Sequence, residues 1–176
     1  MKDTEIIESL IGKMGLAAGR HLYGILGSYG RLKEFAEKLQ QASLPDGTRF
    51  PAPVSVNRRI MEAISDEEFK RLAEGEARMP EPVVGAVTAG FESFMRELLK
   101  NKTTSILNGL EMLFAYDVEF TVLRTMAADE NKVILLLPGK RTGGKTIMYP
   151  DWNAGSYTLP STLVAQDHLW ELKEKA

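Results

Sequence analysis

Residues 132–149 have the sequence KVILLLPGKRTGGKTIMY, and this stretch constrains the fold more than any other. Residues 133–137 are apolar at every position, which predicts a strand that is buried on both faces. Gly143 and Gly144 can adopt the positive φ angles that a tight hairpin turn requires. The β-branched and aromatic residues that follow predict a partner strand. The stretch therefore predicts a β-hairpin with its tip at residues 139–145.

The same stretch also matches the phosphate-loop pattern GxxxxGK[ST], with Gly139 at its start and Lys145 and Thr146 at its end. A phosphate loop binds phosphate through backbone N–H groups at the start of a helix that follows the loop. Here the loop is followed by residues 147–160, IMYPDWNAGSYTLP, which contain two prolines and no helical stripe. We therefore expect no nucleotide at this loop, and the sequence predicts no cofactor.

The hairpin tip is basic, although the whole chain has a formal net charge of −2. Lys140, Arg141 and Lys145 lie in or beside the turn, and no acidic residue occurs between residues 131 and 150. These three residues are candidate contacts for nucleic-acid phosphates, because phosphate contacts are made largely by lysine and arginine. They are equally candidate contacts for an acidic protein partner. A third interpretation is a solvated turn that binds nothing.

Downstream of residue 115 the hydrophobic period changes from 3.6 residues to 2. Tyr116, Val118, Phe120 and Val122 alternate with polar residues, which predicts a strand with one buried face. Together with the hairpin this strand predicts a small three-stranded antiparallel β-meander. Residues 160–175 predict a C-terminal helix that covers the meander.

The N-terminal part of the chain has helical periodicity. Residues 4–41 predict two helices that are separated by a break near Gly27 to Gly30, and a short helix follows at residues 56–64. Ser65 and Glu68 form a capping box that opens the next helix. Two more helices are predicted at residues 82–100 and 104–114. The predicted fold class is therefore α+β, a single domain of residues 1–176 with a helical part at 1–115, containing five or six helices, and the meander plus terminal helix at 116–176.

Three glycines, Gly12, Gly15 and Gly19, are spaced so that they share one face of a helix. A helix face without side chains allows another backbone to approach closely. We considered packing inside the monomer, a close helix contact at a subunit interface, and the approach of a ligand.

The segment YPDWNAGSY at residues 149–157 concentrates aromatic side chains after the basic hairpin. Tyr149, Trp152 and Tyr157 are candidate contacts for a partner, because aromatic residues commonly anchor partners or stack on bases. Trp152 would alternatively cover a sheet edge. The two histidines, His21 and His168, are candidate general bases only if a nucleophile lies near them.

Composition excludes several classes of protein. The 176 residues include no cysteine, which removes disulfides, thiolate metal sites and cysteine nucleophiles, and two histidines argue against zinc. No segment approaches the length of an apolar membrane span, so we expect no membrane and a cytoplasmic protein. The sequence predicts a non-enzymatic interaction or assembly module, either a homo-oligomer or an accessory subunit of a larger complex. The alternative is a nucleic-acid-binding accessory protein that uses the basic tip.

Overall fold

A parallel β-sheet forms the centre of the molecule in the computed structural model, which describes residues 1–101, 103–152 and 155–174. The parallel strands lie in the order β2–β3–β4–β1–β7. Their bounds are β1 (Leu22–Gly27), β2 (Val54–Ser55), β3 (Thr104–Asn108), β4 (Lys132–Thr142) and β7 (Leu169–Glu171). The predicted antiparallel meander is therefore wrong, and the chain has an α/β fold.

β4 takes part in two kinds of pairing. Its first half pairs in parallel with β1, with Leu22 opposite Val133 and Gly27 opposite Pro138. Its second half extends beyond the parallel sheet and pairs in antiparallel fashion with β5 (Lys145–Met148). β5 in turn pairs with the short β6 (Tyr157–Thr158). The predicted hairpin is thus confirmed, and it is an extension of a central parallel strand.

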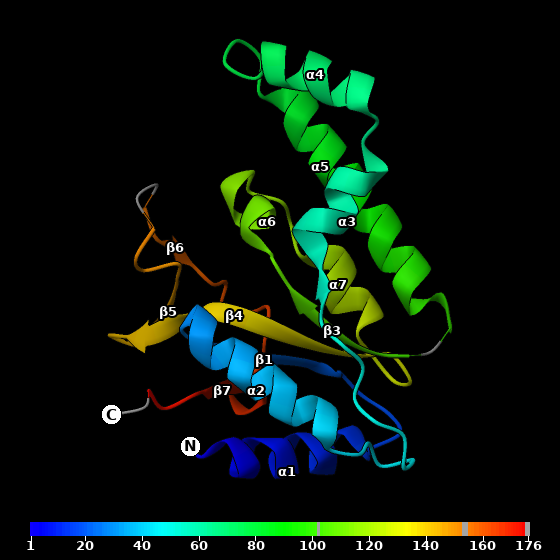
Figure 1. Cartoon of the computed structure of the whole chain (residues 1–176), viewed down its shortest axis with the longest axis vertical. Helices are drawn as coiled ribbons and strands as arrows, with labels where there is room; N and C mark the ends of the chain where they lie inside the picture. Colours follow the sequence, from blue (N-terminus) through cyan, green and yellow to red (C-terminus); the bar gives the residue numbers. More distant parts are fainter. Residues whose placement is uncertain (102, 153–154, 175–176) are drawn as a thin grey trace.

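Helices cover both faces of this sheet (Figure 1). α1 (Asp3–Met14) and α2 (Tyr29–Gln41) lie on one face, where their apolar side chains join those of β1 and β4 in one hydrophobic cluster. The other face is covered by α3 (Val56–Ala63), α5 (Glu81–Leu98), α6 (Glu111–Ala115) and α7 (Thr121–Met126). Because β4 contributes to both clusters, residues 133–137 are buried on both faces, as their composition predicts.

α4 (Asp66–Gly75) projects away from the sheet together with the beginning of α5 (Figure 1). The Ser65 side chain accepts a hydrogen bond from the Glu68 backbone N–H at 3.2 Å, which confirms the predicted start of this helix. The helices α3, α4 and α5 agree with the sequence prediction to within a few residues. None of the described helices is both long and apolar enough to cross a lipid bilayer.

The start of α2 is held firmly against α1. The Arg31 guanidinium donates to Asp3 at 2.7 Å, and both side chains are only 9% exposed. Lys38 also donates to Asp3, and the Arg31 Nε donates to the Lys173 carbonyl at 3.0 Å. Since a buried ion pair requires such additional hydrogen bonds to be stable, this network fixes α2 relative to α1 and to residue 173 after β7.

Four predicted elements are wrong. The supposed helix break near Gly27 to Gly30 is the end of strand β1 and the beginning of α2. Residues 104–114 form β3 and then α6, where one helix was expected. Residues 116–122, expected to be a strand, are a loop up to residue 120 and then the first two residues of α7. The predicted C-terminal helix at 160–175, whose last residue lies outside the described part of the chain, is a turn, the 3-10 helix η2 (Gln166–His168) and strand β7.

Two of these corrections have a local cause in the backbone. Asp117 has φ 50°, a left-handed conformation that ends any extended strand at residue 116. Gly109 has φ 60° and separates β3 from α6. Gly24 lies in β1, where an added Cβ would be 2.6 Å from the end of the Leu169 side chain, so a larger residue there would force the side chain of the neighbouring β7 to shift.

Candidate functional site

The carboxyl ends of the parallel strands meet at one edge of the sheet, which we call the carboxyl edge. From the end of β1 the chain continues through α2 to β2, at one end of the strand order. From the end of the adjacent β4 it continues through β5 and β6 to β7, at the other end of the strand order. Connections that leave neighbouring strands in opposite directions create a crevice, and open α/β sheets bind their ligands at this position. The topology therefore predicts a ligand site at the carboxyl ends of β1 and β4.

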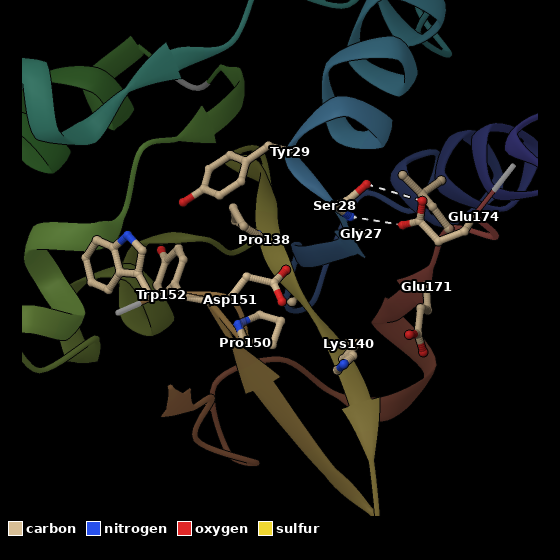
Figure 2. A pocket seen from close by; sticks show the side chains of 13 residues that line it. Gly27, Ser28, Tyr29, Pro138, Lys140, Pro150, Asp151, Trp152, Glu171 and Glu174 are labelled. Atoms are coloured by element: carbon tan, nitrogen blue, oxygen red, sulfur yellow. Dashed lines mark hydrogen bonds between the residues drawn. The ribbon is translucent and has the colours of Figure 1, made fainter. Parts of the chain in front are cut away.

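A cavity of about 440 Å³ lies at this point. Its walls come from four segments that are distant in sequence: the β1–α2 junction, the middle of β4, the loop after β5, and the end of β7. In Figure 2, Trp152 lies on one side of the cavity, Glu174 lies on the opposite side, and Asp151 lies between them. The lining residues used below are Ser28, Tyr29, Lys140, Tyr149, Asp151, Trp152, Glu171 and Glu174.

The aromatic wall contains the three residues that the sequence singled out. The Tyr149 and Trp152 ring centroids are 5.0 Å apart, and Tyr157 lies 6.1 Å from Trp152 and 6.3 Å from Tyr149. Phe114 completes the cluster from α6, with its ring 5.5 Å from Tyr149. Tyr149 is buried, Tyr157 is half-buried and Trp152 is exposed. Of the three, Tyr149 and Trp152 line the cavity.

The Tyr149 hydroxyl is unusual, because it is buried and has no hydrogen-bond partner in the described part of the chain. The whole residue is 2% exposed. Burial, with a smaller contribution from the negative charge of Glu111, raises the pKa of this phenol above its ordinary value, so the hydroxyl remains a neutral donor. A buried polar group without a partner is costly, and such a group beside a cavity indicates a position that a ligand or water occupies.

The N-terminus of α2 forms the opposite wall. The Ser28 backbone N–H and the Ser28 hydroxyl both donate to the carboxylate of Glu174, at 3.4 Å and 3.3 Å (Figure 2). Glu174 follows β7, so the end of the described chain reaches over the cavity. The first N–H groups of a helix have no partner within the helix, and Glu174 supplies one for Ser28.

A shallow groove of about 610 Å³ continues along the carboxyl edge between α2 and the ends of β2 and β3. Tyr29 and Pro138 line both this groove and the cavity. The Tyr29 hydroxyl donates to Glu111 at 2.9 Å, and the Asn57 side chain donates to the other oxygen of the same carboxylate at 2.7 Å. The segments that follow β1, β2 and β3 are therefore joined at this edge.

The three basic residues of the hairpin do not form one surface. Lys140 lines the cavity. The Arg141 guanidinium donates to the Leu169 carbonyl at 2.5 Å, and the Arg141 backbone N–H donates to Glu171 at 3.3 Å. Arg141 and Lys145 line a different pocket, beside residues 158–161. The hairpin tip also projects away from α3 and α7 (Figure 1), so the arginines of these helices do not join the basic residues of the tip in one positively charged surface.

The glycines Gly12, Gly15 and Gly19 do not form a packed face inside the described molecule. α1 ends at Met14, so Gly19 lies outside the helix, and all three glycines are exposed. An added Cβ would meet no atom within 4 Å at Gly12 or Gly19, and only the preceding turn of its own helix at Gly15. Packing of this face against another helix of the monomer is therefore not observed, and a role in self-association stays a prediction.

The histidines lie away from the cavity, at the start of β1. The His21 ring is hydrogen-bonded to the Tyr23 hydroxyl at 2.7 Å, and burial lowers the pKa of His21. His168 packs against the Tyr23 ring with centroids 4.8 Å apart. No group of three or more histidines, aspartates or glutamates able to hold a metal ion occurs among the described residues.

Comparison of the chain with models of protein families, with curated proteins and with solved structures gave no match. The assignment of a site therefore depends on the geometry alone. Sequence reasoning identified Lys140, Tyr149 and Trp152 but missed Ser28, Glu111 and Glu174. The signal that could have located Ser28 is the order of an apolar segment, LYGILG, then Ser28, then a helical stripe, which is typical of a strand that leads directly into a helix.

Proposed function

We propose that the protein is a binding module that takes a small organic ligand in the cavity at the carboxyl edge. The sequence predicts a module for protein interaction or assembly, and the bound ligand is an addition to that prediction. The cavity volume of about 440 Å³ falls within the range that small-molecule sites occupy in proteins. Membership of a larger complex and a cytoplasmic location are parts of the same proposal.

The observation that carries the proposal is Tyr149, a residue that lines this cavity and whose buried hydroxyl has no hydrogen-bond partner among the described residues. Its ring is already fixed by the contacts with Phe114, Trp152 and Tyr157, so packing alone explains the aromatic part of the side chain. Packing does not explain the hydroxyl, because phenylalanine would fill the same space without burying a polar group. A ligand that hydrogen-bonds to this hydroxyl accounts for it.

The charged groups of the cavity support the same conclusion. Lys140 and Asp151, which carry opposite charges, both line this cavity. Charged side chains that converge on a concave apolar surface are the arrangement by which small-molecule sites orient their ligands. The exposed Trp152 ring adds a flat apolar surface on which a ligand can stack.

The two tryptophans of the chain provide a direct test. In nitrogen-15 NMR spectra each indole N–H gives its own signal, and a Trp152→Phe variant identifies the signal of Trp152. Trp170 is buried in the cluster formed by α1 and α2, on the other face of the sheet, and serves as the internal control. We expect members of a library of small organic acids, amines and neutral compounds to move the Trp152 signal while the Trp170 signal stays in place.

The proposal would be rejected if no compound moved the Trp152 signal at concentrations up to about 1 mM, the weak end of specific small-molecule affinities. It would also be rejected if the active compounds moved only signals of the hairpin tip or of α4.

A further inference from the structure

A second cavity, of about 480 Å³, lies between the hairpin of β4 and β5 and the segment of residues 158–169. We call it the hairpin pocket, and its lining includes Arg141, Lys145, Leu159, Val164 and Leu169. We infer that the hairpin pocket binds a small organic anion, whose oxyanion group contacts the two basic residues and whose apolar part covers the three aliphatic ones. The inference goes beyond the proposed function and does not depend on it.

The hairpin pocket is separate from the cavity at the carboxyl edge, since the two share none of their described lining residues. Successive side chains of a strand point to opposite faces. Lys140 accordingly lines the cavity at the carboxyl edge, and Arg141, the next residue of β4, lines the hairpin pocket. Thr146, directly opposite Arg141 in the β4–β5 pairing, lines the hairpin pocket as well. The two faces of the hairpin therefore contribute to two different cavities.

The charged side chains that line the hairpin pocket are both cationic. They are Arg141 and Lys145, and no aspartate or glutamate occurs among the described lining residues. The two acidic residues closest to them in β7 and η2 are engaged elsewhere. Asp167 is bound by the Lys13 amine at 2.7 Å, and Glu171 accepts the Arg141 backbone N–H at 3.3 Å and lines the other cavity. A concave surface lined by charges of one sign concentrates ligands of the opposite sign, so this pocket favours an anion.

The Arg141 guanidinium is held in position by β7. It donates to the Leu169 backbone carbonyl at 2.5 Å, and the backbone N–H of the same arginine donates to Glu171. A guanidinium carries five N–H donors and the bond to Leu169 takes one of them, so the group can also bind the oxygens of an anion. A side chain that is already fixed loses little conformational entropy when a ligand binds. Arg141 is therefore a preorganised contact for an oxyanion.

The aliphatic residues of the hairpin pocket select an organic anion over an inorganic one. Leu159 and Val164 are buried, and Leu169 is half-buried. An apolar group that covers such side chains gains about 25 cal/mol for each Å² removed from water. A small inorganic ion can contact the basic residues but leaves this apolar surface uncovered. The volume of about 480 Å³ also falls within the range of small-molecule sites.

The proposed anion site differs from a phosphate loop, although residues 139–146 match the sequence pattern of one. A phosphate loop binds phosphate through backbone N–H groups at the start of a helix. Here residues 145–148 form strand β5, so no helix follows the loop. An anion in the hairpin pocket would instead be bound by the side chains of Arg141 and Lys145.

Four probes test this inference: phenyl phosphate, phenylacetate, phenethylammonium and inorganic phosphate. Each is titrated into the full chain at fixed ionic strength, and the NMR methyl signals of Leu159 and Val164 are the readout. We expect both aromatic anions to move these signals, with phenyl phosphate binding more tightly because two cations face its double charge. Phenethylammonium and inorganic phosphate each lack one required group and should bind at least about fivefold more weakly than phenyl phosphate. Tighter binding of phenylacetate would support the anion site and assign it to carboxylates.

Lys145→Gln tests the role of the basic residues, because Lys145 is exposed and its substitution leaves the contacts of Arg141 with β7 in place. Its affinity for phenyl phosphate should fall about two- to fivefold, the effect of one exposed charge pair. Lys145→Arg keeps the charge and should retain the affinity of the unmodified protein. Lys70→Gln is the matched control, because it removes an equal charge from the exposed helix α4, which projects away from the sheet. Its affinity should not change.

Three results would overturn the anion site. They are equal affinity for phenethylammonium and the aromatic anions, equal affinity for inorganic phosphate and phenyl phosphate, and an unchanged affinity in Lys145→Gln. It would also be overturned if no probe moved the methyl signals up to about 10 mM, well above the dissociation constant expected of a specific ligand of this size. None of these results removes the proposed function, which is judged by the Trp152 signal.

Discussion

The hydroxyl of Tyr29, at the start of α2, donates a 2.9 Å hydrogen bond to Glu111, at the start of α6. These two helices cover opposite faces of the sheet, so the bond passes over the carboxyl edge. Tyr29 thereby forms the wall between the cavity and the neighbouring groove. Burial and this hydrogen bond raise the pKa of the Tyr29 phenol, so the bond persists throughout the neutral pH range.

Two substitutions measure how much Tyr29 and Asn57, which both donate to Glu111, contribute to stability. Tyr29→Phe removes one hydrogen bond of a largely exposed side chain, and we expect it to lower the unfolding free energy by at most about 1 kcal/mol. Asn57→Ala removes a half-buried side chain that donates to Glu111 at 2.7 Å and accepts the Met112 N–H at 3.0 Å. Its expected cost is about 1–3 kcal/mol. Urea unfolding of both variants measures the difference, and a larger loss in Tyr29→Phe would contradict this account of the edge.

Much of the helical part and the hairpin could be predicted from the sequence, because their signals are local. The capping box at Ser65 specifies where α4 begins, and Gly143 and Gly144 adopt the positive φ angles that the hairpin turn requires. Residues 133–137 are recognisable as a central strand from their composition alone. In these segments the local preference and the tertiary environment agree.

The parallel sheet could not be predicted in the same way. β1 is buried at all six positions, so it shows no period, and its glycines resemble helix breaks. β2 and β7 have two and three residues, too few for any pattern. The alternation of apolar residues at 116–122 arises because a loop and α7 place them on the same cluster, not because they form a strand. The cavity could not be predicted either, because its lining residues come from segments distant in sequence, which the parallel pairing of β4, β1 and β7 brings together.

The exposed glycine Gly12 provides a second prediction. It lies inside α1, and a Cβ added there would have no other atom within 4 Å, so Gly12→Ala should stabilise the protein by about 0.5–1 kcal/mol through helix propensity. Thermal unfolding measures the change. A loss of stability, or dissociation of an oligomer seen by light scattering, would show instead that this face is packed against another chain.

In contrast to Gly12, Gly139 has no space for an added side chain. An added Cβ would lie 2.6 Å from the Ile147 carbonyl oxygen and 3.0 Å from the Met148 sulfur, within the β4–β5 pairing. Gly139→Ala should therefore destabilise the fold by about 1–3 kcal/mol, the usual cost of forcing atoms into a filled space. Thermal unfolding of Gly139→Ala and Gly12→Ala under the same conditions measures the difference. Equal melting temperatures of the two variants would contradict the packing described around these glycines.

The Asp3 network predicts a specific pH dependence. Burial alone would raise the pKa of Asp3, but Lys38 and Arg31 outweigh it, so the pKa lies below the ordinary value of 3.8. A depressed folded-state pKa contributes stability that is present above the unfolded pKa and is lost as the pH falls through the folded pKa. The stability difference between the unmodified protein and Asp3→Asn should thus be about 2–3 kcal/mol at pH 6 and shrink toward pH 2. Urea unfolding across this range tests it, and a constant difference would refute the assigned shift.

The basic tip still requires its own test. If Lys140, Arg141 and Lys145 contact phosphates, affinity for duplex DNA should fall with salt, with a log–log slope of about −2 to −3 for three contacts. The division of these residues between two pockets leads us to expect no association below about 0.1 mM at low salt. A measured slope of that size, reduced by about one in Arg141→Ala, would support the nucleic-acid alternative instead.

Tyr149→Phe tests the central claim most directly, because the claim holds that the Tyr149 hydroxyl is kept for a ligand. The substitution removes a buried hydroxyl that has no partner among the described residues, so the unfolding free energy should stay the same or rise by up to about 1 kcal/mol. For compounds that move the Trp152 signal, the affinity should fall by about tenfold, the value of one buried hydrogen bond. A variant that loses stability while its affinity for these compounds is unchanged would contradict the account.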